Sequence, residues 1–388
     1  MTRVLLVSHT AEKGGAELFL VDAVRRGPAG WRGAFLSAGP AAAALAQDGR
    51  PPLVLAGGDA MLAIRRGSGM VALAKGASDV FKVARDLAHH ANAFDLLCAN
   101  SQKSLFVCAI AALLAKRPLV WILHDIITDP AFSAVNRRAA IAVANLLAAA
   151  VIVNSQETGE AFVAAGGRAE LVRQVNNGFV VEEWPQASAA AAKQLRSTFN
   201  LGPSPVVSIF GRITEWKGQH VLLDALARVP DAQGLIVGGA LFGHGEWEQR
   251  LRARAAALGI ADRVRFAGFR DDVPALMAGS DVIVHASTAP EPFGRVIVEA
   301  MLTGRPVIAT QGGAIGSIID HGRTGLMVPP SNPHALAAAI QLLLSSPQQA
   351  AEMANEGRTD VAARFDLRET HRVLQAIFTQ AVAGKLGT

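Results

Sequence analysis

Short apolar runs, many of them rich in β-branched residues, alternate with longer stretches of helical pattern along this chain. Most of the short runs are almost continuously apolar, as expected of strands that are covered on both faces. Helices between such strands favour parallel βαβ sheets, so the alternation predicts an α/β fold. The expected strands are 3–8, 52–56, 95–99, 119–123, 150–154, 205–210, 234–238, 263–268, 281–286 and 306–310.

Length and composition exclude several classes of protein. A chain of 388 residues is long enough for two or three domains, at roughly 100–200 residues each. Hydrophobic residues make up 51% of it, which excludes a disordered chain. Cys98 and Cys108 are the only cysteines, so a disulfide scaffold is excluded and a cytoplasmic location is expected. The first apolar run is too short for a signal peptide, and the runs 105–115 and 139–153 are too short to span a membrane.

The stretch 181–205 divides the strand–helix series into two parts: it is polar at first, and a short Ala-rich helix and a Pro/Gly turn are expected to follow. We expect one Rossmann-like domain over 1–185 and a second over 200–367, facing each other across a cleft. A last helix, at about 368–388, is expected to pack back on the first domain. Ligands of such sheets bind outside the carboxyl ends of the strands, so the residues that follow each strand are the candidates for function.

Gly14 and Gly15 follow the first expected strand and precede a helix that starts near Ala16. Glycines let a backbone approach a ligand closely, and a helix N-terminus offers unpaired N–H groups to an anion. An ordinary glycine-rich turn is the alternative. The segment is not a G-x-G-x-x-G sequence, which argues against a nicotinamide-dependent dehydrogenase.

Two basic residues follow the strand 205–210 in the segment 211-GRITEWKG-218. Arg212 comes directly after the turn glycine, and Lys217 stands where the next helix is expected to open. Two cations beside a helix N-terminus suit a diphosphate, and they would stabilise the charge that a diphosphate leaving group gains. A pair of solvent-exposed surface charges is the alternative.

Two glutamates eight positions apart follow the strand 281–286, in the segment 291-EPFGRVIVEAM-301. Glu291 lies in a loop between prolines, and Glu299 is expected on a helix that starts around Phe293 or Gly294. Eight helical residues span about 12 Å, which roughly matches the distance from the sugar to the ribose of a nucleotide sugar. The spacing favours a site in which one carboxylate holds hexose hydroxyls and the other holds the ribose. An exposed helix surface is the alternative.

The pattern Glu291-x7-Glu299, the upstream GR-x4-KG and the G-G-A-E near the N-terminus together resemble glycosyltransferase family 4. The resemblance covers most of residues 205–345 and is weaker over 1–180, where the Gly loop and 121-WILHD-125 stand out. It implies a retaining enzyme of GT-B fold that uses a nucleotide sugar as donor. The C-terminal domain, 200–367, would then be the donor domain, and the N-terminal domain, 1–185, the acceptor domain. No D-x-D sequence occurs in the chain, so we expect Arg212 and Lys217 to neutralise the diphosphate without a metal ion or another cofactor.

The resemblance also implies individual contacts. Arg212 and Lys217 would bind the donor diphosphate, while Glu291 would contact the transferred sugar and Glu299 the ribose. His124, directly after the strand 119–123, matches a family histidine that contacts the donor sugar, although a histidine in this place can also be a structural cap. The other expected donor-binding residues act through their backbone: Gly14, Gly15, Phe293, Gly294 and Arg295.

Two segments depart from the pattern of the family. Family members often carry G-G-x-x-E after the strand 306–310, whereas this chain has 312-GGAIGSIID-320 and no glutamate at that spacing. The contacts that the family makes there are therefore not carried over. The Gly-rich segment 238-GGALFGHGE-246 is longer than a minimal turn, and we expect it to shape the donor pocket.

These patterns predict a retaining glycosyltransferase that moves a hexose from a UDP- or GDP-linked donor to a glycan or lipid-linked acceptor. The resemblance implies bacterial polysaccharide, lipopolysaccharide or glycolipid synthesis, and no nucleic-acid partner. Two alternatives stay open. One is an inverting GT-B transferase with Asp125 or His124 as the base, and the other is a non-catalytic sugar-nucleotide binding partner.

The positive charge of the chain is concentrated in residues 50–117, which hold nine basic and four acidic residues and so account for the whole net charge of +5. Within this stretch, the segment 65–90 carries Lys75, Lys82 and Arg85 among apolar residues at partly helical spacing. Val71, Leu73, Ala74, Ala77, Val80, Phe81 and Ala84 are expected to form one apolar side. Such a segment can lie on an anionic membrane on the cytoplasmic side. The alternatives are a helix packed on the sheet with its charges in water, or a site for a soluble anionic substrate.

Overall fold

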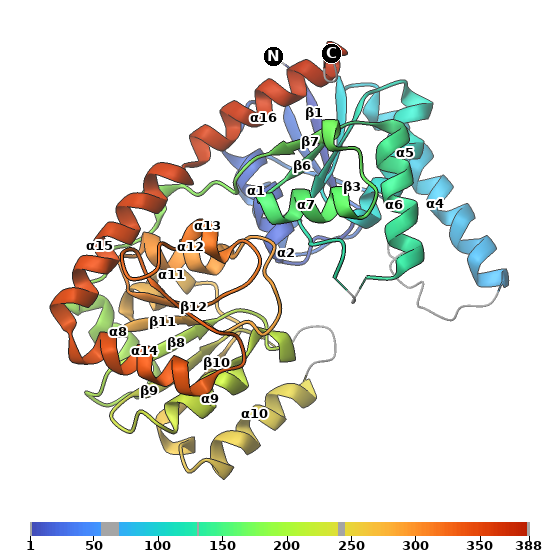
Figure 1. Cartoon of the computed structure of the whole chain (residues 1–388). Coiled ribbons are helices and arrows are strands. Elements are labelled where there is room, and N and C mark those ends of the chain that lie inside the picture. The colour runs from blue at the N-terminus through green and yellow to red at the C-terminus, as the bar shows by residue number, and fades with distance from the viewer. Residues whose placement is uncertain (1, 56–69, 130–131, 240–244, 386–388) are drawn as a thin grey trace. The chain divides into compact units, whose positions relative to one another are not determined.

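A computed structural model describes residues 2–55, 70–129, 132–239 and 245–385 of the chain (Figure 1). The chain divides into two units. The first comprises Met1–Phe179 together with Leu367–Thr388, and the second comprises Val180–Asp366. The second unit therefore begins before residue 200, and the stretch expected to be a junction belongs to it.

The first unit is built on a parallel sheet, whose strand order is β3-β2-β1-β4-β5-β6-β7 over the described residues. Its order reverses between β1 and β4, which is where Rossmann-like sheets bind ligands. The strands are β1 (Val4–Ser8), β2 (Trp31–Phe35), β3 (Leu53–Val54), β4 (Leu96–Ala99), β5 (Leu119–Leu123), β6 (Ala148–Val153) and β7 (Val172–Gln174).

Helices cover both faces of this sheet, because successive side chains of a strand point to opposite sides. Leu5 and Val7 of β1 pack in one core cluster, while Val4 and Leu6 pack in another. The first cluster is completed by α4 (Met70–Ala91), α5 (Gln102–Ala115), α6 (Ala134–Leu147) and α7 (Gln156–Ala164). The second is completed by α1 (Gly15–Arg25), α2 (Pro40–Gln47) and α16 (Leu367–Val382).

Helix α16 is part of the first unit although it follows the second one in sequence. The backbone N–H of Leu367 donates to the carbonyl of Phe179 over 3.0 Å, so the chain returns to the first unit at the point where it left it. The ring of Phe378 packs edge-on against Trp31, with centroids 5.2 Å apart, and both side chains are buried. Figure 1 shows α16 beside β1 and the N-terminus.

The second unit repeats this architecture with the parallel strand order β10-β9-β8-β11-β12-β13 over the described residues. Its order reverses between β8 and β11. The two parallel sheets confirm the predicted α/β class with two Rossmann-like domains. The strands are β8 (Val206–Phe210), β9 (Gln233–Val237), β10 (Val264–Gly268), β11 (Val282–His285), β12 (Val307–Thr310) and β13 (Leu326–Val328).

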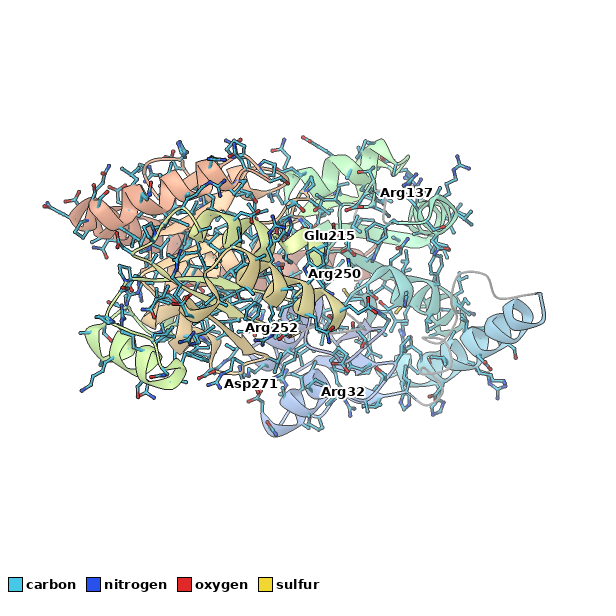
Figure 2. The ribbon with its side chains drawn as sticks, turned by 90° about the horizontal axis from the view of Figure 1, so that it is seen from below. Arg32, Arg137, Glu215, Arg250, Arg252 and Asp271 are labelled. Carbon is cyan, nitrogen blue, oxygen red and sulfur yellow. The ribbon has the colours of Figure 1, made fainter. Side chains whose placement is uncertain are left out.

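The helices of the second unit are amphipathic and pack on its own core. Helix α8 (Ala189–Phe199) contacts α11 (Val273–Gly279), and a Cβ at Gly279 would clash with α8. The polar helix α10 (Gly245–Ala257) buries Leu251 and Ala255 and exposes Arg250 and Arg252, which are labelled in Figure 2. The others are α9 (Gln219–Leu226), α12 (Arg295–Leu302), α13 (Ile315–Ile318), α14 (Pro333–Ser345) and α15 (Pro347–Arg364).

Helix α4 carries most of the basic segment 65–90. Residues 65–69 and the side chains of 70–77 lie outside the described part, which leaves out Val71, Leu73, Ala74, Lys75 and Ala77. Ala84 is buried in the core beneath the helix, whereas Phe81 is 51% exposed. The expectation that Ala84 and Phe81 share one apolar side is therefore wrong, because Ala84 packs in the core of the first unit. Lys82 and Arg85 are exposed. Among the described helices, none is both long and apolar enough to cross a membrane.

Candidate active site

In the second unit, the turn after β8 is pressed against the loop after β11. The turn contains the 3-10 segment Glu215–Lys217 and then Gly218, which has φ +70°. A Cβ at Gly218 would clash with the carbonyl oxygen of Ala286, so only glycine allows this approach. The N–H of Thr288 donates to the carbonyl of Trp216 over 2.7 Å and ties the two segments together.

This approach places Lys217 beside Glu291. The Nζ of Lys217 lies 2.5 Å from Oε1 of Glu291, and the two side chains are 16% and 7% exposed. A buried charge is costly unless it is paired and hydrogen-bonded, so each residue depends on the other. The sequence predicted both residues as site residues but did not predict that they pair with each other.

Glu291 is held in its ionised form. Burial by itself would raise the pKa of Glu291, but the charge of Lys217 and the hydrogen bond from His285 outweigh it and hold the pKa well below its ordinary value. An ionised carboxylate only accepts hydrogen bonds. Glu291 can therefore receive a hydrogen bond from a hydroxyl group, but it has no proton to give to a leaving group.

Two further residues reach the same carboxylate and were not predicted. Ser287 Oγ lies 2.7 Å from Oε1 of Glu291, and His285 Nε2 lies 3.0 Å from the same oxygen. Their only signal in the sequence is that they are polar residues at the carboxyl end of an apolar strand. That is where this kind of sheet binds its ligands.

The backbone of Glu291 is fixed by the glycine pair of the segment 312–320. Glu291 forms a parallel bridge with Gly313, and the N–H of Ala314 donates to the Glu291 carbonyl over 2.9 Å. Gly313 has φ +60°, and a Cβ there would clash with the backbone of Glu291. The segment thus supports Glu291 through its backbone, a contact that does not need the glutamate missing from the family pattern.

Helix α12 starts at Arg295 with Gly294 as its N-cap at φ +95°, one or two residues later than expected. Only residues 295–299 are helical between the two glutamates, so the estimate of about 12 Å, which assumed eight helical residues, does not apply. Glu299 is buried and pairs with Arg295, whose Nε lies 3.4 Å from Oε1 of Glu299. The ring of Phe293 is also buried and packs edge-on against Phe365, so its side chain belongs to the core.

Arg212 and Lys217 differ in their surroundings, although the sequence predicted them as a pair. Arg212 is exposed, and its carbonyl accepts a hydrogen bond of 2.9 Å from Nε2 of the buried Gln219. No acidic residue in the described part of the chain forms an ion pair with Arg212, whereas Lys217 shares its charge with Glu291. Arg212 therefore keeps its charge available for an anionic ligand.

In the first unit, the candidate glycines lie at the carboxyl end of β1. Gly14 is the N-cap of α1, and the helix starts at Gly15. Glu17, on the first turn of α1, is buried and accepts a hydrogen bond of 2.8 Å from Ser8 Oγ. A Cβ at Gly14 would come within 2.7 Å of Oε2 of Glu17. The glycine leaves room for this buried carboxylate.

His124 follows β5 and is held by Asn100, which follows β4. The Nδ2 of Asn100 donates to the carbonyl of Ala16, so its Oδ1 is the atom that accepts from His124 Nε2 over 2.9 Å. This assignment puts a proton on Nε2 of His124. The ring of Phe19 packs edge-on against the imidazole. Asn100 was not predicted as a site residue, and the alternative base Asp125 is exposed.

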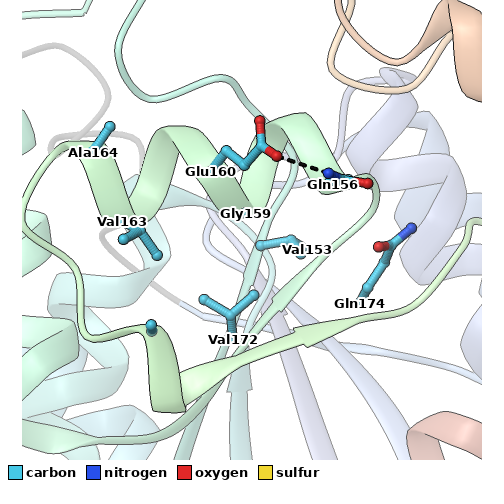
Figure 3. A pocket seen from close by; sticks show the side chains of 9 residues that line it. Val153, Gln156, Gly159, Glu160, Val163, Ala164, Val172 and Gln174 are labelled. Atoms are coloured by element: carbon cyan, nitrogen blue, oxygen red, sulfur yellow. Dashed lines mark hydrogen bonds between the residues drawn. The ribbon is translucent and has the colours of Figure 1, made fainter.

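A separate groove of about 530 Å³ lies at the edge of this sheet, between α7 and the edge strand β7 (Figure 3). Gln156 Nε2 donates to Glu160 Oε1 over 2.8 Å at its rim. None of the predicted site residues lines it. The lining is mostly apolar and includes Val153, Gly159, Val163, Ala164, Ala169, Val172 and Gln174.

Within the described residues, no cluster of three His, Cys, Asp or Glu side chains suits a metal ion.

Comparisons with known proteins agree with this geometry. Residues 193–360 match the family of glycosyl transferases group 1, and residues 28–178 match the glycosyl transferase 4-like domain. HepE from Anabaena, crystallised with UDP and glucose, is 36% identical, and the similarity covers 98% of this chain and 100% of that one, with a TM-score of 0.89. This chain belongs to the family 4-like glycosyltransferases. The match over 28–178 shows that the likeness extends well into the first unit, where the sequence motifs are weaker.

This glycosyltransferase also resembles curated bacterial proteins over part of their length. The lipopolysaccharide core biosynthesis glycosyltransferase LpsE of Rhizobium meliloti is 35% identical over 42% of this chain and 46% of its own length. A GDP-mannose-dependent phosphatidylinositol monomannoside mannosyltransferase of Mycobacterium tuberculosis is 33% identical over 54% and 56%. The chain thus spans about half the length of the curated relatives it matches. The likeness to HepE over the whole chain establishes the predicted GT-B fold.

Proposed function

We propose that this glycosyltransferase moves a hexose from a nucleoside diphosphate sugar to a glycan or to a lipid-linked acceptor, with retention at the anomeric carbon. The ion pair between the partly buried Lys217 and the buried Glu291, beyond β11, is the observation that carries the proposal. HepE was crystallised with UDP-glucose, which favours a UDP-linked hexose among the donors. The likeness to LpsE favours an acceptor of lipopolysaccharide type.

Different residues of the second unit contact different parts of the donor. Lys217 has three N–H groups, of which one is directed at Glu291, so another can reach a phosphate oxygen. Arg212 adds a second positive charge as the diphosphate departs and gains charge. Glu291 accepts hydrogen bonds from hexose hydroxyls, and Glu299 accepts them from the ribose. The backbone at 293–295 helps to hold phosphate or sugar, since the N-terminus of α12 lies there.

In the first unit, the donor is contacted by Gly14, Gly15 and His124, as the family resemblance implies. The proposed retention corresponds to attack of the acceptor on the same face of the sugar, guided by the departing phosphate. His124 Nε2–H is engaged by Asn100, which suits a group that orients the sugar. Inversion with His124 or Asp125 as a base is the second candidate, and NMR of the product anomer separates the two.

Metal independence and location belong to the same proposal. Two cations, Arg212 and Lys217, supply positive charge at the diphosphate, so no metal ion is required.

We place the protein in the cytoplasm, with α4 touching an anionic membrane surface. Phe81, Lys82 and Arg85 support this placement because an apolar ring and two cations lie exposed on one helix.

Turnover of a panel of UDP-, GDP- and ADP-hexoses, followed by mass spectrometry, tests the proposal. Hydrolysis of one donor in water, and its transfer once a glycan or lipid-linked acceptor is added, is the expected result. A protein that binds a nucleotide sugar in calorimetry but never turns it over would instead be a non-catalytic binding partner.

A further inference from the structure

We propose that His285 and Ser287 are positioning residues, which lock one oxygen of Glu291 so that its other oxygen is presented to the donor sugar. The proposal rests on the sugar contact proposed for Glu291. It adds two residues from the end of β11 to the residues that determine turnover.

The two residues reach the same carboxylate because of the alternation of side chains along a strand. His285 ends β11, and Ser287 stands two positions later, so both point to the same side. Ala286 between them points away, and its carbonyl oxygen is the group that Gly218 approaches. His285 and Ser287 are 5% and 2% exposed.

All the donors converge on one oxygen of Glu291. Lys217 Nζ, Ser287 Oγ and His285 Nε2 lie 2.5, 2.7 and 3.0 Å from Oε1. Oε2 has no donor among the residues that the structure describes. Each carboxylate oxygen has about two lone pairs, so Oε1 is fully used while Oε2 can accept a sugar hydroxyl.

The donors themselves are held in place. Ser287 Oγ and His285 Nε2 lie 3.1 Å apart, which allows the imidazole N–H to be shared between the hydroxyl and Oε1. Thr310 of β12 donates to the backbone carbonyl of Ser287 over 2.7 Å. The acceptor oxygen is thus oriented before the sugar arrives, which is how preorganised groups favour a transition state.

The other nitrogen of His285 argues against a purely structural residue. Its Nδ1 is buried and has no partner within the described part of the chain. An unpaired buried nitrogen is unfavourable, and an apolar side chain in this position would avoid that cost. The imidazole is explained by the hydrogen bond from its Nε2 to Glu291.

Removing either donor should lower turnover and spare nucleotide binding. We expect Ser287→Ala and His285→Leu each to lower kcat by about tenfold, which corresponds to an activation free energy about 1.4 kcal/mol higher. The Kd for UDP, which lacks the sugar, should change less than about twofold. His285→Gln, which offers an N–H in place of Nε2–H, should recover most of the turnover.

Ser280→Ala is the matched control. Ser280 is also a buried serine and precedes the same strand, where its Oγ lies 2.6 Å from Ser208 Oγ. We expect this variant to lose some thermal stability and to keep the kcat of the wild type. The comparison separates loss of a buried hydroxyl from loss of the contact with Glu291.

The outcomes distinguish this proposal from the proposed function. If Glu291→Gln lowers kcat while Ser287→Ala and His285→Leu keep it, the positioning proposal fails alone. If Glu291→Gln itself keeps full turnover, the sugar contact of Glu291 fails. If the two variants lose UDP affinity and thermal stability in proportion to kcat, and His285→Gln recovers nothing, then their part is structural and the positioning proposal is overturned.

Discussion

Lys217 connects two functions through one ammonium group, since it pairs with Glu291 and is expected to touch the diphosphate. Lys217→Ala should lower kcat/KM at least tenfold, by roughly 1.4 kcal/mol or more, because it removes a cation from the leaving group and leaves a buried carboxylate unpaired. Steady-state kinetics measures this. Lys193→Ala, which removes an exposed lysine of α8, should have no effect. Full activity in both Lys217→Ala and Arg212→Ala would refute the diphosphate site.

The two glutamates should respond differently to the same small change. Glu299→Gln is expected to weaken nucleotide binding, because Glu299 is assigned to the ribose, whereas Glu291→Gln is expected to lower turnover. Calorimetry with the free nucleoside diphosphate and kinetics with the whole donor measure the two effects. An equal loss of diphosphate affinity in both variants would contradict the assignment.

Gly218 tests the contact that brings Lys217 to Glu291. Gly218→Ala should lower the thermal midpoint, because the left-handed backbone costs about 1–3 kcal/mol with a side chain and the new Cβ meets the carbonyl of Ala286. Gly259 has the same φ of +70° but open space around it, so Gly259→Ala isolates the backbone cost. Equal thermal midpoints for the two variants would show that the chain relieves the clash with Ala286 at no measurable cost in stability.

At the scale of single residues, the sequence reveals those functional residues that stand at a characteristic spacing. The pattern of Glu291 and Glu299 and the pair Arg212 and Lys217 can be recognised without a structure, because each spacing lies within one short continuous segment of the chain. His285 and Asn100 could not be found in this way. Each acts through a partner on another segment, and the meeting of those segments depends on strand order and on side-chain direction.

Among the elements, the buried strands are the ones that the sequence predicts well. Every expected strand overlaps an observed strand, because strands covered on both faces are nearly continuous apolar runs. Three observed strands, β2, β7 and β13, were not expected, and each was missed for a physical reason. β2 carries the exposed Arg32 and the small Gly33, while β7 and β13 have only three residues each, which is too short for a pattern to emerge.

Helix α4 gives a prediction about membranes. The protein should sediment with vesicles that contain anionic lipid and dissociate as salt rises, because basic residues near such a surface contribute about 1 kcal/mol each and are screened by ions. Replacing Lys82 and Arg85 with Gln should reduce sedimentation and leave donor hydrolysis intact. Lys193→Gln is the control. If the wild-type protein ignores these vesicles at low salt, α4 is an ordinary helix with a solvated face.

For the whole molecule, the two sheets were predictable from the order of strands and helices, and a last helix was expected to return to the first domain at about residue 368, but residues 186–199 were assigned to neither domain. The Ala-rich stretch 189–199, expected as a short helix within a junction, forms α8 and packs on α11 of the second unit. Its small residues allow the close approach to Gly279 that makes it part of the second unit. Composition alone does not distinguish a linker from a closely packed helix.

The division into units predicts how fragments behave. A fragment of residues 180–366 should fold alone, since its sheet and core are contiguous in sequence. A fragment of residues 1–179 should not, because it lacks Phe378 and the other buried residues of α16. Circular dichroism and thermal unfolding of the two fragments measure this. Cooperative unfolding of fragment 1–179 would show that α16 is dispensable for the first core.

Metal independence is tested on the intact enzyme. Activity should persist in EDTA, because Arg212 and Lys217 are expected to supply the positive charge at the diphosphate. The donor assay with and without chelator is the measurement. Loss of activity in EDTA that Mg²⁺ or Mn²⁺ restores would overturn this expectation.

The return of the chain at Leu367 also fixes an order of events during synthesis. A ribosome adds roughly 5–20 residues per second, so the stretch 180–366 separates residue 179 from the start of α16 by on the order of 10–40 s. During that interval the apolar surface around Trp31 lacks the cover of Phe378, and the later unit has all its residues before α16 is made. The unit that emerges first is thus completed last, and its uncovered surface is the place where a nascent-chain chaperone would be expected to bind.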